Sequence, residues 1–114
     1  MSREWQFYTA PGGGSPVEKD IRRANLAHHE LGRMQEIMDR VAEGRALPKE
    51  VKYLRDGVFE FKLNLSQRTY RLLYAEVDGN LVLLALHFFA KKKQVDKKAI
   101  DVAVERLRNW QAQA

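Results

Sequence analysis

The chain has 114 residues, a formal net charge of +5 and a calculated pI near 9.6. This length corresponds to one domain, which can bury a sizeable core without disulfides or metals. Cysteine is absent, which excludes disulfides, thiol catalysis and cysteine-ligated zinc and fits a reducing compartment.

No segment has the pattern of a membrane helix or a signal peptide. The longest apolar run, 81–86 with the aromatic residues that follow it, is far shorter than the ~20 residues of a membrane span. The N-terminus is charged where a signal peptide would be apolar. We therefore expect a soluble, cytoplasmic protein.

The positive charge is concentrated in one part of the chain. Residues 1–61 hold ten basic and ten acidic side chains, and residues 99–114 hold two of each. Residues 62–98 hold eight basic and three acidic side chains, so this segment carries the whole net charge. Such concentration is typical of proteins that bind phosphate groups or acidic partners, although charge of this size can also serve solubility alone.

The N-terminal half predicts a strand and two helices. Residues 4–9 alternate as a short strand, and a Gly/Pro-rich connector follows. Ser15 can cap a helix that has Pro16 at its first position. Residues 27–43 carry apolar side chains on one side of a second helix, which Gly44 can end.

The C-terminal half predicts three strands and a helix. Residues 45–57 have the composition of a loop, and 59–65 then alternate as a strand with one buried face. A second strand over 68–77 leads into the Asp78-Gly79 hairpin signal, and 80–90 returns as a third strand. A final helix, which Asp96 can cap, has one apolar face made of Ile100, Ala103, Val104, Leu107 and Trp110. The predicted order is β-α-α-β-β-β-α in a single domain covering residues 1–114.

The spacing of Lys62 and Arg71 indicates a basic pair on one face of the sheet. If Ser66 and Gln67 form the tip of the hairpin, Lys62 lies directly opposite Arg71, with Cβ atoms ~5 Å apart. Two like charges at such positions are unfavourable unless an anion lies between them. A three-residue tip would instead place Lys62 opposite Leu72, so this inference depends on the register.

Arg71 itself has two interpretations. It stands between apolar residues in "YRLLY", and its guanidinium offers a planar fork of donors that suits bidentate phosphate binding. The alternative is an ion pair with Glu60 or Glu76. For the cluster as a whole, the alternative is an exposed face with solvated charges.

The end of the last predicted strand carries the run "HFFAKKKQ". At most two of Lys91, Lys92 and Lys93 can face one site, because strand side chains alternate. Phe88 and Phe89 could stack on bases but at this spacing are more often core residues. A lone strand histidine such as the one at 87 can exchange protons near neutral pH, although it is more often structural.

No other catalytic pattern is present in the sequence. His, Asp and Glu show no metal-site spacing, and "GGG" at 12–14 lacks the residues of a phosphate-binding loop. We therefore expect no metal and no cofactor, and an enzyme of this sequence would use arginine, lysine, tyrosine and histidine.

Several motifs in the right order resemble the RelE/ParE superfamily of toxins from toxin–antitoxin modules, most of all its HigB-like, phage-derived branch. The motifs are "FYTAPGGGSPVEKDI", "LRDGVFEF", "YRLLY", "FFAKKK" and "AIDVAVERLRNW". The resemblance implies an α/β (α+β) fold: a four-stranded antiparallel or mixed sheet, two N-terminal helices on one face, a basic cleft on the other, and a C-terminal helix.

The resemblance also implies an activity. Most RelE- and HigB-like members cut messenger RNA in the ribosomal A site without a metal. The 2′-hydroxyl attacks the adjacent phosphate and leaves a cyclic phosphate and a free 5′-hydroxyl. Carried over by position, Arg71 would stabilise the phosphorane, with Lys62 and Lys92 or a neighbour as further cations.

The resemblance assigns further candidates and a partner. Candidates for the proton donor and acceptor are Tyr70 and His87. Further cations that could contact RNA are Arg68, Lys91, Lys93, Lys97 and Lys98. The expected partner is a separately encoded antitoxin, usually a helix-turn-helix protein in this branch. The alternatives are a ParE-like gyrase inhibitor and a non-catalytic basic module that binds RNA or a partner.

Overall fold

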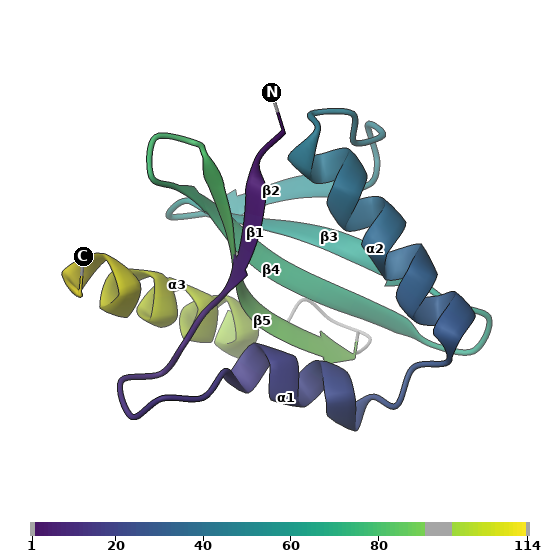
Figure 1. Cartoon of the computed structure of the whole chain (residues 1–114), viewed down its shortest axis with the longest axis horizontal. Helices are drawn as coiled ribbons and strands as arrows, with labels where there is room; N and C mark the ends of the chain where they lie inside the picture. The colour runs from purple at the N-terminus through teal and green to yellow at the C-terminus, as the bar shows by residue number, and fades with distance from the viewer. Residues whose placement is uncertain (1, 91–96, 114) are drawn as a thin grey trace.

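Residues 2–90 and 97–113, which the computed structural model describes, form a five-stranded mixed sheet and three helices (Figure 1). The strands are β1 (Glu4–Phe7), β2 (Val51–Arg55), β3 (Val58–Asn64), β4 (Thr69–Val77) and β5 (Val82–Ala90). The helices are α1 (Pro16–Arg23), α2 (His28–Ala42) and α3 (Lys97–Ala112). Across the sheet the order is β1-β5-β4-β3-β2; β1 runs parallel to β5 and the other neighbours are antiparallel.

The number of strands differs from the prediction. The α+β class and the helices are confirmed, but the sheet has five strands because residues 51–55, predicted as loop, form β2. Asp56 and Gly57 explain the extra strand. Both have positive φ, 52° and 84°, and they connect Arg55 to its partner Val58. This is the geometry of a two-residue hairpin turn, so the chain before it must pair with β3.

The first face of the sheet packs against α1 and α2, and we call it the α2 face. It carries the apolar side chains of alternate residues: Phe59, Phe61, Leu63, Tyr70, Leu72 and Tyr74. Trp5 of β1 packs edge-on against Phe61 and Tyr74, and its Nε1 donates to the Met38 carbonyl of α2 at 2.8 Å. These contacts fix α2 over the β1 side of the sheet.

The opposite face packs against α3, and we call it the α3 face. Its side chains from β3 and β4 are Val58, Glu60, Lys62, Asn64, Thr69, Arg71, Leu73, Ala75 and Val77. The buried residues Ala99, Ala103, Val104 and Leu107 of α3 contribute to the core. Over β3 and β4 the two faces therefore differ in chemistry: the α3 face holds Glu60, Lys62 and Arg71, whereas the α2 face is apolar except for Glu76 near one end of β4.

A β-bulge at Leu86 changes the alternation of β5. Leu73 pairs with His87 and Tyr74 pairs with Ala85, so Leu86 has no partner in the ladder. Its carbonyl accepts a hydrogen bond from Arg106 Nη1 of α3 at 2.8 Å. Beyond the bulge, His87 and Phe89 lie on the α3 face and Phe88 lies on the α2 face. The bulge thus decides which side chains accompany Arg71.

The helix ends follow the sequence signals. The Ser15 side chain accepts from the Glu18 N–H at 3.3 Å and caps α1, as predicted. Gly44 has a φ of 73°, and its N–H donates to the Val41 carbonyl at the end of α2. A glycine adopts this left-handed conformation without steric strain. Asp96, the predicted cap of α3, lies outside the described residues.

An ion pair joins α2 to the connection that precedes β2. Arg40 Nε donates to Glu50 Oε1 at 3.2 Å, and Arg40 Nη2 pairs with Glu50 Oε2. Glu50 also accepts from the Leu47 N–H at 3.3 Å. The hydrogen bond from Arg40, supported by the Leu47 N–H and the Arg40 charge, holds the pKa of Glu50 below its usual value near 4.5 despite the opposing effect of burial. The connection is therefore held against α2.

The lowered pKa of Glu50 predicts acid sensitivity. Because the folded protein favours the charged carboxylate, this ion pair stabilises the fold fully above about pH 4.5. Its contribution is lost as the pH falls through the lower, folded pKa. Urea unfolding between pH 3 and pH 6 should therefore show a shallower loss of stability for Glu50→Gln than for wild type. Glu43→Gln, which removes an exposed carboxylate paired only with Arg45, is the control; an equal effect of both substitutions would contradict the assignment.

Candidate active site

The β3–β4 hairpin brings Lys62 and Arg71 together on the α3 face. The two residues are direct partners in the ladder, as the two-residue tip predicted. The Leu65 N–H donates to the Arg68 carbonyl at 2.8 Å and closes the turn around Ser66 and Gln67. Side chains opposite each other on one face have Cβ atoms ~5 Å apart, so the two cationic side chains extend from neighbouring positions on the same face.

A carboxylate lies beside this cationic pair. Glu60 is two residues from Lys62 on the same face, and its Oε2 accepts from Arg71 Nη1 at 3.0 Å. The pair is buried: only 3% of Glu60 and 8% of Arg71 is exposed. The ion-pair interpretation of Arg71 is therefore correct for Glu60. It is wrong for Glu76, which pairs with Arg3 on the other side of the sheet.

The Arg71 guanidinium is not fully satisfied by Glu60. Among the residues that the structure describes, the buried Nε of Arg71 has no hydrogen-bond partner. A buried donor without an acceptor costs about 1–3 kcal/mol, and such groups are rare in folded proteins. Arg71 thus combines an orientation imposed by Glu60 with a buried donor that has no partner among the described residues.

His87 lies on the same face, next to Arg106 of α3. Its Nδ1 is 3.4 Å from Arg106 Nη1, and its ring stacks on Phe89 with centroids 4.8 Å apart. Phe89 is the ladder partner of Arg71 on β5, and Leu73, the partner of His87, also pairs with Glu60. The bulge at Leu86 therefore places an imidazole within the same cluster as the Glu60–Arg71 pair.

Tyr70 does not join this cluster. It precedes Arg71 and so points to the α2 face, where it is 5% exposed and its ring stacks on Phe88 at 5.1 Å. Its hydroxyl accepts a hydrogen bond from Arg68 Nη1 at 3.1 Å. The structure therefore separates this proton-transfer candidate from Arg71 by the thickness of the sheet.

The remaining predicted cations are distributed differently. Arg68 is exposed in the β3–β4 turn, and Lys97 and Lys98 are exposed at the start of α3. Lys91, Lys92 and Lys93 lie outside the described residues. Phe88, predicted as core, is 2% exposed, whereas Phe89 is only partly buried.

The described part of the chain contains no candidate metal site and no membrane-spanning helix. In residues 2–90 and 97–113, no group of three or more His, Asp or Glu side chains could hold a metal ion. No helix in the same residues is both long and apolar enough to cross a bilayer.

With this geometry in place, the chain can be compared with known proteins. The sequence pattern of the phage-derived protein Gp49-like family matches residues 22–108. The chain belongs to this family. The matched region of the Gp49-like chain runs from α1 to α3 and so includes every described residue of the cluster around Arg71.

A solved structure shows the same fold. A double mutant of the E. coli toxin RelE in the free state matches with a TM-score of 0.62 and 19% sequence identity. The match covers 94% of the Gp49-like chain and 99% of the RelE chain. Family and fold together confirm the RelE-like superfamily that the motifs predicted. No curated protein matches the sequence.

Sequence reasoning missed Arg106 as a neighbour of His87 and could not choose between phosphate and carboxylate as the partner of Arg71. The signal for the carboxylate was the position of Glu60, which stands two residues before Lys62 and therefore lies on the same face as Arg71. Arg106 gave no such signal, because the contact depends on how α3 crosses the bulge.

The buried ion pair predicts that Arg71 affects stability as well as any activity. Arg71→Ala leaves Glu60 charged, buried and unpaired, which should lower the free energy of unfolding by about 3–5 kcal/mol. Urea unfolding measures this loss. Replacing both partners, Glu60→Leu with Arg71→Met, should restore the wild-type value or exceed it by about 1–4 kcal/mol.

Arg45→Ala serves as the surface control for this experiment. Its partner Glu43 is two residues away and both side chains are largely exposed, so the unfolding midpoint should stay near that of wild type. If Arg71→Ala were as stable as Arg45→Ala, the buried pair would not have the energetic role that the geometry assigns.

Proposed function

We propose that this Gp49-like protein is the toxin of a type II toxin–antitoxin module and acts as a ribosome-dependent endoribonuclease on messenger RNA. The observation that carries the proposal is the placement of Lys62 opposite Arg71 on the α3 face of a RelE-like sheet. The burial and orientation of Arg71, its unpaired Nε and the nearby imidazole of His87 support it.

The proposed reaction needs no metal. The 2′-oxygen of a ribose attacks the adjacent phosphorus, and a pentacoordinate phosphorane with additional negative charge forms. The bond to the 5′-oxygen of the next nucleotide then breaks, which leaves a 2′,3′-cyclic phosphate and a 5′-hydroxyl. Donors already oriented toward the developing charge stabilise such a transition state, and one donor of this kind contributes ~10²–10³ in rate.

The cluster supplies groups for each part of this reaction. The Arg71 guanidinium and the Lys62 ammonium would donate to the phosphorane oxygens. Glu60 would act as a positioning residue, because its bond to Nη1 restricts the guanidinium to one orientation. His87, which shares the face with Arg71, is our candidate for proton transfer; Tyr70 lies on the other face.

Further contacts and partners are proposed from the superfamily resemblance. Lys92, with Lys91 or Lys93 as the alternative, would add a cation to the site. The exposed Arg68, Lys97 and Lys98 would contact the RNA backbone. A cognate antitoxin, a helix-turn-helix protein in this branch, would neutralise the toxin in the cytoplasm.

Lys62→Met is the sharpest test of the proposed site, since it removes a charge without leaving a buried partner: among residues 2–90 and 97–113, Lys62 has no ion pair. Induced expression of wild type should arrest growth and produce new 5′-hydroxyl ends within translated messages. Lys62→Met should lower the cleavage rate by ~10²–10³. Lys19→Met, an exposed cation of α1, is the matched control.

The nature of the product decides against the other functions. Growth arrest with inhibited DNA supercoiling and intact messages would identify a gyrase inhibitor. Binding to RNA without cleavage and without arrest would identify a non-catalytic module. Wild-type cleavage by Lys62→Met would overturn the assigned site while leaving the activity in place.

A further inference from the structure

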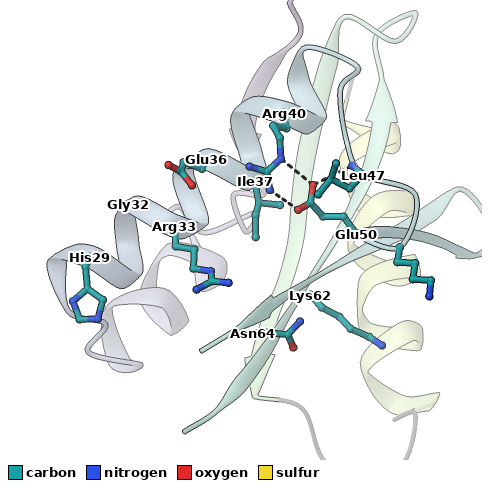
Figure 2. Close-up of a pocket in the computed structure, with 11 residues that line it drawn as sticks. His29, Gly32, Arg33, Glu36, Ile37, Arg40, Leu47, Glu50, Lys62 and Asn64 are labelled. Carbon is teal, nitrogen blue, oxygen red and sulfur yellow. Dashed lines mark hydrogen bonds and ion pairs between the residues drawn. The ribbon is translucent and has the colours of Figure 1, made fainter. Parts of the chain in front are cut away.

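A hollow of about 750 Å³ lies between α2, the connection before β2 and the end of β3 (Figure 2). Six of its lining residues come from α2, three from residues 47–50 and two from β3. In that order they are His29, Gly32, Arg33, Glu36, Ile37 and Arg40, then Leu47, Lys49 and Glu50, then Lys62 and Asn64. Its volume is in the range of ligand sites, ~300–1,000 Å³.

The sheet edge explains why this space is open. Strand β2 begins at Val51, whose partner is Phe61, so β3 continues past it from Lys62 to Asn64 without a neighbour on that side. The Arg40–Glu50 pair holds the connection against α2 and not against this free end of β3 (Figure 2). Gly32 also contributes, because a Cβ built on it would meet nothing within 4 Å.

The charges around the hollow favour an anion. Arg40 and Glu50 neutralise each other, which leaves Arg33, Lys49 and Lys62 against the single carboxylate of Glu36. Within the described part of the chain, none of these three cations forms an ion pair. Three unpaired cations around one concave space attract a phosphate group more than scattered surface lysines would.

The rest of the lining suits a nucleotide more than an isolated phosphate ion. Leu47 is 58% exposed at the hollow, and Ile37 adds a second apolar contact surface. The Asn64 amide oxygen accepts from Thr69 Oγ1 at 3.2 Å, which leaves the amide N–H₂ able to donate. A base or ribose could pack on the aliphatic side chains while its phosphate contacts the cations.

Lys62 connects the hollow to the candidate active site. It lines the hollow and is also the ladder partner of Arg71. A single RNA strand that passes Arg71 can therefore reach Arg33 and Lys49 around one sheet edge. We propose that the hollow binds a nucleotide of the same RNA strand, next to the cleaved phosphate, through Arg33, Lys49 and Lys62. This inference rests on the proposed function.

The test measures binding separately from cleavage. The probe is a fluorescently labelled single-stranded RNA of ten nucleotides with 2′-O-methyl groups throughout, which cannot be cleaved by 2′-hydroxyl attack. Arg33→Ala with Lys49→Ala should weaken binding about tenfold or more, since each contact is a charge-assisted hydrogen bond. The slope of log K against log salt should fall by about 1.4, or ~0.7 for each lost phosphate contact.

Gly32→Met tests the cavity without changing charge. Its side chain would occupy the open space, and replacing a mid-helix glycine favours the helix by ~1 kcal/mol, so weaker RNA binding could not be attributed to unfolding. Lys19→Ala, which removes a cation that does not line the hollow, should bind like wild type. A decaglutamate peptide serves as a competitor that matches the RNA in number of units and sign of charge but has neither phosphates nor bases.

The outcomes separate this inference from the proposed function. Loss of binding in both hollow variants supports the nucleotide site, whether or not wild type cleaves translated messages. The inference is overturned if wild type does not bind the probe, if both variants bind like wild type, or if decaglutamate displaces the RNA at equal concentration. The last result would identify the hollow as a site for an acidic protein segment. Absence of cleavage by wild type overturns only the proposed function.

Discussion

The ion pair between Glu60 and Arg71 is the interaction on which the rest of the architecture depends. Charges buried to this degree are tolerated only when they are paired, and the pairing exists in one register of β3 against β4. A slip of β4 by one residue against β3 would move Arg71 to the α2 face, beside Phe59 and Phe61, and would leave Glu60 without its partner on the opposite face. The pair therefore selects the register that also places Lys62 beside Arg71, so one constraint serves both folding specificity and the candidate chemistry.

The two faces of the sheet divide stability and function between them. On the α2 face, aromatic and aliphatic side chains pack against two helices, and the Trp5 contact to the α2 backbone locks that layer. On the α3 face, the helix covers part of the sheet and charged residues occupy the remainder. An apolar layer on one side supports a polar, partly unsatisfied cluster on the other. RelE has the same overall fold at 19% identity, so that fold accommodates very different side chains.

Local signals predicted most of the fold, whereas the site required tertiary information. The sequence left two registers open for this hairpin, and the structure has the one in which a two-residue tip at Ser66 and Gln67 places Lys62 opposite Arg71. The same logic, applied to Asp56 and Gly57, would have predicted β2; the loop-like composition of 45–50 concealed it. Alternation alone excludes Tyr70 from the face of Arg71. No local pattern could reveal the contact of Arg106 with His87 or the hollow beside α2, because both depend on how a helix crosses the sheet.

The bulge at Leu86 has a consequence for how this sequence tolerates change. Before the bulge, the odd-numbered residues of β5, such as Ala85, lie on the α2 face. After it, the odd-numbered residues His87 and Phe89 lie on the α3 face. If the same residues paired with β4 without a bulge, every residue after Ala85 would shift by one place in the ladder, and the two sides of the strand's end would be exchanged. Phe88 would then lie beside Arg71, and His87 would enter the aromatic layer. The composition of the cluster thus depends on the one extra residue that β5 holds at the bulge, and deletion of Leu86 would remove the bulge while keeping His87 and Phe89 opposite Leu73 and Arg71.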